Sequence, residues 1–408
     1  MKTRKTRKLM SFILTAVMAV MMMTAVVSAA TTYDPIPGTT TTFDKYLIMP
    51  ADANVPDVEF TFTIAGGTEV NGDATNLAVY SGADTDKATA LPTIGSATFA
   101  PGDTTYTSVQ TGDASVTLNT GEKYAVQVVT VDFTGVNFKE PGVYRYTITE
   151  TASTVSGIIY DNVPKTLDVY VEDAGDGTLR VGNGTSEGYV LYNSVISTAP
   201  SKTTTDVSAN KASGFVNRYE TFDLTVGKSV AGNQASRDEY FQFTINITGA
   251  LPNTTYNVDL SDADATTAVN GINTTANSNA ASFTTDASGA ATITYWLQHD
   301  QSIVIQGLTK NAKYSVSENA TTIANEGYVA TATVTSDSDD DQTVSMPAVT
   351  DTSTGITDDT IIAYTNTKEG VIPTGIIISV AGLLVVGIIA VIGFVFFGIR
   401  SKKRYDEE

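Results

Sequence analysis

Two short stretches of the sequence share one pattern: Tyr146-Thr-Ile-Thr-Glu150 and Tyr314-Ser-Val-Ser-Glu318. Each alternates apolar and polar residues with a period of two, which is typical of a strand that has one face in a core. Tyr146, Ile148 and Glu150 therefore share one strand face, and the glutamate points inward with its apolar neighbours. Because a buried carboxylate is costly unless it is paired, we expect each glutamate to have a partner inside a β-sheet protein.

The surroundings of these stretches recur in the same order in both halves of the chain. Each half holds a lysine, then a Phe-x-Phe-Thr-Ile segment, then the glutamate, and closes with an aromatic residue, a spacer and an asparagine. Besides the glutamates, the members are Lys45, Phe60-Thr-Phe-Thr-Ile64 and Phe215-Val-Asn217 in the first half, and Lys228, Phe241-Gln-Phe-Thr-Ile245 and Tyr364-Thr-Asn366 in the second. The asparagine shares a strand face with its aromatic neighbour. We infer that lysine, glutamate and asparagine are paired in each half.

The rest of the chain up to residue 370 also reads as short strands. Segments 58–64, 124–130, 167–171 and 302–305 alternate, turn residues such as Asp173-Ala-Gly-Asp-Gly177 lie between strands, and no long helical periodicity appears from residue 31 to 370. This pattern favours antiparallel β-sandwiches. We predict an all-β fold of two tandem Ig-like antiparallel β-sandwich domains, residues 31–220 and 221–370, with almost no linker.

The N-terminal residues read as a secretory signal peptide, residues 1–30. A basic head, Met1-Lys-Thr-Arg-Lys-Thr-Arg-Lys8, precedes an apolar run over residues 9–27 and the small residues Ser28-Ala29-Ala30. A charged head, an apolar middle and a small-residue exit are the features of such a peptide, and we expect cleavage near Ala30. A membrane anchor is the alternative for the apolar run.

The C-terminal residues predict a membrane helix and a sorting signal. Residues 376–399 form an apolar segment without charge, and this segment is long enough to cross a bilayer core of roughly 30 Å. The basic residues of tail 400–408 hold this end of the segment on the cytoplasmic side. The preceding Val371-Ile-Pro-Thr-Gly375 resembles the signal read by sortases, which implies cleavage between Thr374 and Gly375 and transfer of the threonine carbonyl to an amine. Val371-Ile372 replaces the familiar Leu-Pro, as in the relaxed signals of some pilin subunits. A plain single-pass membrane protein is the alternative.

Composition excludes several classes of function. Without the five Lys/Arg of residues 1–30 and the four Lys/Arg and three Asp/Glu of the tail, 15 cations and 41 acids remain, a net charge near −26. Such a chain repels nucleic acid and anionic membranes. The absence of cysteine and the single His299 exclude thiol chemistry and most histidine catalysis and zinc binding, so we expect no metal and no cofactor. Without disulfides, stability outside the cell needs another source.

The repeated residues resemble the streptococcal-type pilin isopeptide-linkage domain family, which includes the major backbone pilins of Gram-positive bacteria. The second copy is the clearer, with Leu297-Gln-His-Asp-Gln-Ser-Ile-Val-Ile-Gln-Gly-Leu308 followed by the glutamate stretch. The resemblance covers most of both halves but is poor over residues 66–120, which implies insertions there. It implies a covalent bond from Lys45 to Asn217 with Glu150 assisting, and one from Lys228 to Asn366 with Glu318 assisting.

The residue types are suited to this reaction. A lysine attacks a carboxamide only as the neutral amine, and burial disfavours its charged form. A buried glutamate is pushed towards the protonated form, which can hydrogen-bond the asparagine amide, polarise its carbonyl and pass a proton to the leaving ammonia. A plain Lys–Glu salt bridge is the alternative, but the repetition, the missing cysteines and the sorting signal favour the bond. It forms once per domain, so the chain is not an enzyme in the usual sense.

Together these features predict a structural subunit of a sortase-assembled pilus shaft, secreted and held in the cell wall at the cell surface, with only transient membrane anchoring. Its expected partners are a sortase, neighbouring pilin subunits and peptidoglycan. The resemblance implies an acceptor lysine shortly before the bonding asparagine of the first domain, which is Lys211, with Lys202 and Lys165 as competitors. The alternative is a wall-anchored adhesin or minor pilus subunit that binds a host or matrix ligand.

Overall fold

A computed structural model describes residues 32–153, 155–182, 188–202, 210–260, 279–336, 339–345, 348–351 and 355–370. The predicted signal peptide 1–30, sorting motif 371–375, membrane helix 376–399 and tail 400–408 lie outside these residues. Within the described part of the chain, no helix has the length and apolarity needed to cross a membrane.

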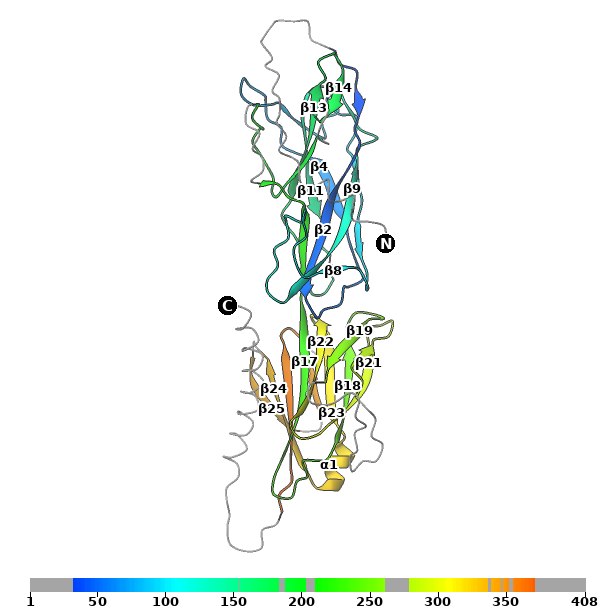
Figure 1. Ribbon diagram of the computed structural model, residues 1–408, viewed down its shortest axis with the longest axis vertical. Coiled ribbons are helices and arrows are strands. Elements are labelled where there is room, and N and C mark those ends of the chain that lie inside the picture. The colour runs from blue at the N-terminus through cyan, green and yellow to red at the C-terminus, as the bar shows by residue number, and fades with distance from the viewer. Residues whose placement is uncertain are drawn as a thin grey trace.

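The described chain is nearly all β-structure, as the sequence predicts, and its sheets fall into two groups. Strands up to residue 219 pair only with one another, and so do strands from residue 221 onward. The two groups lie end to end along the long axis of the molecule (Figure 1). We refer to residues 32–219 as the N-terminal half and to residues 221–370 as the C-terminal half.

The N-terminal half contains two sheets with six strands each and two small two-stranded ribbons. One sheet runs β14-β13-β11-β4 with β15 and β5 attached, and the other runs β12-β16-β2-β9-β6 with β8 attached. The strands are β1 (Ile36–Pro37), β2 (Thr40–Pro50), β3 (Val58–Phe60), β4 (Phe62–Gly66), β5 (Val79–Ser81), β6 (Thr93–Ile94), β7 (Ala97–Phe99), β8 (Thr105–Tyr106), β9 (Glu122–Asp132), β10 (Asn137–Phe138), β11 (Gly142–Glu150), β12 (Ile158–Ile159), β13 (Lys165–Asp173), β14 (Leu179–Val181), β15 (Tyr189–Tyr192) and β16 (Gly214–Tyr219).

The C-terminal half contains a seven-stranded sheet, β20-β19-β22-β17-β27-β24-β25, and a four-stranded sheet, β21-β18-β23-β26. One short helix joins the two sheets. The elements are β17 (Thr221–Ala231), β18 (Phe241–Thr248), β19 (Thr255–Asp259), β20 (Ser282–Thr284), β21 (Ala291–Leu297), β22 (Gln301–Thr309), β23 (Lys313–Glu318), α1 (Ala320–Glu326), β24 (Val329–Ser336), β25 (Asp339–Ser345), β26 (Ala348–Asp351) and β27 (Thr360–Thr367).

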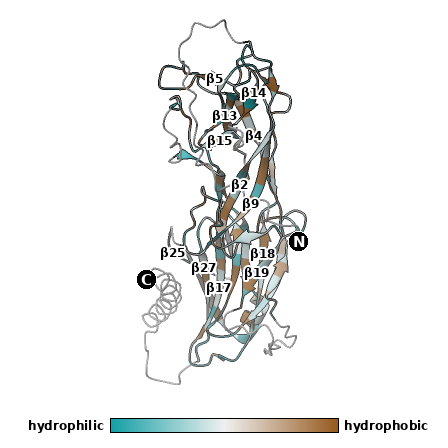
Figure 2. Ribbon diagram, turned by 45° about the horizontal axis from the view of Figure 1, so that its top comes forward, coloured by the Kyte–Doolittle hydropathy of each residue, from teal (hydrophilic) through white to brown (hydrophobic). Residues whose placement is uncertain are grey.

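Each half has its own large cluster of buried hydrophobic side chains, contributed by strands of both of its sheets. Figure 2 shows hydrophobic residues along the strands of both halves. The alternation read from the sequence explains this, because every second side chain of a strand faces the opposite sheet. In β18, Phe241, Phe243, Ile245 and Ile247 are buried while the residues between them are not.

Two local features differ from the sequence reading. Segment 58–64 forms two strands, since β3 pairs with β7 and β4 pairs with β11. Helix α1 was not expected, because its seven residues are too few to show a helical period. Its signals are at its ends: the Asn319 side chain accepts hydrogen bonds from the N–H groups of Thr321 and Thr322, and Gly327 at φ 73° ends it.

The halves contact each other directly where β16 runs into β17. Glu220 pairs with Lys310 at 2.6 Å, and the hydroxyl of Tyr219 lies 2.7 Å from that of Thr309. Ser156 donates a further hydrogen bond to the carbonyl of Lys310. One residue, Glu220, separates the two strands, so the chain passes from one half to the other without a flexible spacer.

Candidate functional site

The lysine and the asparagine of the N-terminal half lie on neighbouring strands of one sheet. Strand β16 runs parallel to β2, with Phe215 opposite Lys45 and Asn217 opposite Leu47. Since side chains two residues apart share a face, Lys45 and Asn217 both point to the same side. Glu150, at the end of β11 in the facing sheet, is paired with Phe62 of β4. The three residues therefore meet between the two sheets.

The C-terminal half repeats this register. Strand β27 runs parallel to β17, with Tyr364 opposite Lys228 and Asn366 opposite Val230. Glu318 ends β23 of the facing sheet and is paired with Phe243. The lysine is thus opposite the residue two before the asparagine in both halves. The sequence prediction that these three residue types meet twice agrees with the geometry.

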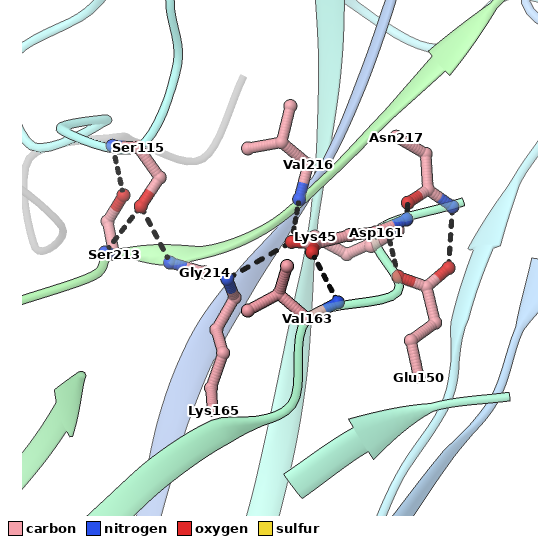
Figure 3. Close-up of polar contacts among 10 residues, drawn as sticks. All are labelled: Lys45, Ser115, Glu150, Asp161, Val163, Lys165, Ser213, Gly214, Val216 and Asn217. Carbon is pink, nitrogen blue, oxygen red and sulfur yellow. Dashed lines mark hydrogen bonds and ion pairs between the residues drawn. The ribbon is translucent and has the colours of Figure 1, made fainter. Parts of the chain in front are cut away.

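In the N-terminal half, Glu150 contacts both other members of the cluster (Figure 3). Lys45 Nζ lies 2.6 Å from Glu150 Oε2, and Asn217 Nδ2 donates a hydrogen bond of 2.5 Å to Glu150 Oε1. Lys45 and Asn217 are 0% exposed and Glu150 is 6% exposed. The carboxyl group therefore bridges the amine that would attack and the nitrogen that would leave, in a place closed to water.

In the C-terminal half, one oxygen of the glutamate makes both contacts. Lys228 Nζ lies 2.7 Å from Glu318 Oε1, and Asn366 Nδ2 donates a 2.7 Å hydrogen bond to the same oxygen. All three residues are buried. Among the described residues, Glu318 Oε2 and Asn366 Oδ1 find no hydrogen-bond partner.

Each amine lies over the face of an aromatic ring. Lys45 Nζ lies 4.8 Å from the ring centroid of Phe60, and Lys228 Nζ lies 4.3 Å from that of Phe241, the residue that corresponds to Phe60 in the repeat. Burial lowers the pKa of Lys45 to about 8 against the opposing effect of the Glu150 carboxylate, and the pKa of Lys228 to about 8 likewise.

The glutamates shift in the opposite direction. Burial raises the pKa of Glu150 and that of Glu318 above the usual carboxyl value, although the neighbouring lysine and asparagine oppose this change. Lysine and glutamate thus approach each other in acidity. A proton can then pass from the ammonium to the carboxylate, which leaves a neutral amine beside a neutral acid, the state that the reaction needs.

One detail differs from the sequence reading, which expects the glutamate to polarise the asparagine carbonyl. Glu150 faces the amide nitrogen of Asn217, while the amide oxygen Oδ1 accepts a 2.8 Å hydrogen bond from the backbone N–H of Asp161. A backbone N–H can pair only with the oxygen of an amide, so it fixes this orientation. The sequence offers no periodic signal for Asp161, which lies between strands β12 and β13.

The three candidate acceptor lysines differ in their surroundings. Lys165 is 4% exposed, pairs with Asp161 at 3.1 Å and lies over the ring of Phe215. It therefore cannot present its amine to another protein. Lys202 is partly exposed and donates a hydrogen bond to the carbonyl of Asp73. Lys211 is also partly exposed, on a segment bridged to Tyr192.

A buried ion pair, which the sequence analysis did not single out, holds the segment that precedes Lys202. Arg145 forms two hydrogen bonds with Asp168, of 2.8 and 2.7 Å, across the neighbouring strands β11 and β13. It also donates to the carbonyls of Ile196 and Thr198. Arg145 points away from the core face that carries Glu150, and it fastens the segment that leads from β15 towards Lys202.

For a bond between Lys45 and Asn217, we expect a rate with a bell-shaped pH profile, because the Lys45–Glu150 pair would react only while it holds one proton. At low pH both groups are protonated and the amine is blocked; this limit lies above the usual carboxyl pKa, since that of Glu150 is raised. Above about pH 8 the last proton leaves and the acid is lost. Timed mass spectrometry of refolding chains at a series of pH values checks this. A rate that rises steadily up to pH ~11, beyond the usual lysine pKa, would contradict it.

The fold and the site define a class of protein: an all-β chain in which each half holds lysine, glutamate and asparagine in one buried cluster. Residues 41–220 match the family described as Spy0128-like isopeptide containing domain. Residues 222–368 match a family described as a domain of unknown function, DUF7601. The N-terminal half is therefore similar to the Spy0128-like isopeptide containing domains.

Known proteins extend this similarity over most of the chain. A protein named Pilin from Streptococcus pyogenes serotype M1 is 26% identical over 353 residues, which cover 86% of this chain and 87% of the relative. The crystal structure of the major pilin from Streptococcus pyogenes has a TM-score of 0.51 at 20% identity, over 82% of this chain and 100% of that one. A mutant of the same pilin gives a TM-score of 0.52 at 19% identity, with the same coverage. The relationship to Gram-positive major pilins is confirmed, and a pilus subunit is supported.

Proposed function

We propose that this chain is the repeating subunit of a sortase-assembled pilus shaft on a Gram-positive cell surface. Residues 31–220 and 221–370 act as two Ig-like β-sandwich domains, each closed by one covalent bond. The bonds join Lys45 to Asn217 and Lys228 to Asn366. The observation that carries this proposal is the identical register of the two buried clusters, one in each half.

The bond suits a protein under tension. It ties the first long strand of a half to its last, and these two strands are already neighbours in the sheet. Chain-entropy reasoning gives a stabilisation of about 5 kcal/mol for a cross-link that closes a loop of this length. Each bond forms once and releases one ammonia, so Glu150 and Glu318 assist a single intramolecular event.

Assembly requires two further steps, which we also propose. After export, a sortase cleaves between Thr374 and Gly375 and transfers the Thr374 acyl group to an amine of the next subunit or of peptidoglycan. Membrane anchoring through residues 376–399 is then transient. Lys211 is the proposed acceptor between subunits, because the family resemblance implies an acceptor shortly before Asn217 and because Lys165 is buried in an ion pair.

Replacing Lys211 by alanine is expected to abolish polymerisation while export continues. The chain is expressed in a Gram-positive host that carries a pilus-type sortase, and wall extracts are separated on denaturing gels. Wild type gives ladders that resist detergent, and Lys211→Ala gives a single species, because no amine accepts the acyl group. Lys202→Ala is the matched control and keeps the ladder.

The same gels separate the shaft proposal from its alternative. If the wild-type chain forms only one wall-linked species, it is an anchored adhesin or a minor subunit and not a shaft protein. If Lys202→Ala removes the ladder and Lys211→Ala does not, the shaft role stands but the acceptor is Lys202.

A further inference from the structure

The two clusters differ at the oxygen of the asparagine amide. In the N-terminal half, Asn217 Oδ1 accepts the Asp161 N–H at 2.8 Å. In the C-terminal half, Asn366 Oδ1 is buried and has no hydrogen-bond donor among the described residues. This oxygen becomes negatively charged when an amine adds to the amide carbon, so a donor aimed at it lowers the barrier.

Strand pairing explains why the Asp161 N–H is available. Strand β12 pairs with β16 only through Ile158 and Ile159, so continued pairing would place Asp161 opposite Val216. Instead, the chain leaves this sheet and enters β13 of the facing sheet after Pro164, which has no N–H. The Asp161 side chain accepts a hydrogen bond of 3.3 Å from the Val216 N–H. The backbone N–H of Asp161 donates to the side-chain oxygen of Asn217.

In the C-terminal half, the corresponding segment remains hydrogen-bonded within its sheet. Asp161 would lie opposite Val216, the residue before the bonding asparagine, and Thr331 is the residue that lies opposite the matching Thr365. Strand β24 begins at Val329 and pairs with β27 over its whole length, with Ala330 opposite Asn366. Its backbone groups are thus part of the sheet, and no chain crossing brings an N–H to the asparagine side chain.

The loop that carries Asp161 is held in place by its side chain. Oδ1 accepts the N–H of Val163 at 3.2 Å, and Oδ2 lies 3.1 Å from the ammonium of Lys165 (Figure 3). Lys165 is itself buried against the ring of Phe215. These contacts fix the direction of the backbone N–H before any reaction occurs. Such preorganisation makes an oxyanion donor effective.

We propose that the backbone N–H of Asp161 is a catalytic oxyanion donor for the N-terminal bond, that the Asp161 side chain with Lys165 positions it, and that the C-terminal half reacts without such a donor. The inference rests on the proposed bond formation. Lys45 Nζ forms a bond to Asn217 Cγ, and the carbonyl electron pair moves to Oδ1 beside the N–H. When the carbonyl re-forms, the Cγ–Nδ2 bond breaks and ammonia leaves. Glu150 gives a proton to Nδ2 and regains one from Nζ, so no other reactant is needed.

An amide-to-ester substitution tests the donor directly. The full chain is made by cell-free translation with the α-hydroxy analogue of aspartate at position 161, which replaces the N–H by an oxygen and keeps the side chain. After translation is stopped, samples are quenched, digested and measured by mass spectrometry for both cross-linked peptides. We expect the N-terminal bond to form about 100-fold more slowly than in wild type, the cost of one lost oxyanion donor, while the C-terminal rate is unchanged.

Two further chains serve as controls. The ester at Val163 removes a hydrogen bond from the same loop without touching Asn217, and it should keep the N-terminal rate within a few-fold of wild type. Asp161→Asn keeps the backbone N–H and should also react far faster than the ester at 161. In the wild-type chain, the N-terminal bond should form at least about tenfold faster than the C-terminal one.

The outcomes separate this inference from the proposed function. If both bonds form in wild type but the ester at 161 leaves the N-terminal rate unchanged, the donor assignment is wrong and the bonds stand. If Asp161→Asn is slow while the ester at 161 reacts at the wild-type rate, the side chain and not the N–H matters. If neither half loses ammonia in wild type, bond formation itself fails, and the inference falls with it.

Discussion

A chain with Glu150→Ala is expected to retain the C-terminal bond and to lack the N-terminal one. Without the carboxyl group, nothing takes the proton from Lys45 or delivers one to the departing nitrogen of Asn217. The mass should exceed that of wild type, corrected for the substitution, by one ammonia. The free energy of unfolding of the N-terminal half should fall by about 5 kcal/mol, which lowers its midpoint by roughly 10–20 °C for a domain of this size.

Two variants make this test specific. Glu150→Gln keeps the size of the side chain and can still accept the hydrogen bond from Asn217, but it cannot exchange protons with Lys45. It should lose the bond as completely as the alanine variant. Thr149→Ala changes the adjacent residue on the other face of β11 and should keep the bond. A Glu150→Gln chain that still releases both ammonias would show that the carboxyl group is not needed.

The second large effect is expected under force. When a chain of residues 32–370 is pulled from both ends, tension enters at β2 and leaves at β27, and in each half it passes through the Lys–Asn bond. The residues between lysine and asparagine then carry no load. We expect no unfolding step in wild type below the force that breaks covalent bonds, since hydrogen-bonded strand pairs are bypassed.

Removing one bond should release a predictable length of chain. From Lys45 to Asn217 there are 172 residue steps, and from Lys228 to Asn366 there are 138. At about 3.3–3.6 Å per residue, Glu150→Ala should add a step of roughly 600 Å, less the folded length, and Glu318→Ala one of roughly 480 Å. Single-molecule extension traces measure both. Steps of these lengths in wild type would contradict the proposed load path.

The repeated residues account for what could be predicted from the sequence. Alternation places Glu150 and Asn217 on inward faces, and inward polar residues need partners. With two copies in the same order, the partnership of lysine, glutamate and asparagine could be predicted without knowing strand order. The all-β fold followed from the same alternation, and both are borne out by the geometry of β2, β11 and β16.

Other features depend on tertiary contacts that leave no local pattern. The Asp161 N–H reaches Asn217 because the chain changes sheets at that point, and only the three-dimensional path shows this. Arg145 lies next to Tyr144 and Tyr146 and is as buried as they are, because Asp168 faces it on the next strand. Segment 66–120, predicted to hold insertions, contains the short strands β5 to β8, which attach to the edges of larger sheets or form a ribbon with β3. These strands are too short, and their sequence too polar and irregular, to show an alternating pattern.

The most direct test of the account is the intact mass of the exported chain, residues 31–374, purified after folding. We predict a mass lower than the sequence mass by two molecules of ammonia, with peptides that join Lys45 to Asn217 and Lys228 to Asn366 after digestion. A mass equal to that of the unmodified sequence would mean that both clusters are ordinary buried salt bridges, and the proposal of a covalently closed shaft subunit would have to be abandoned.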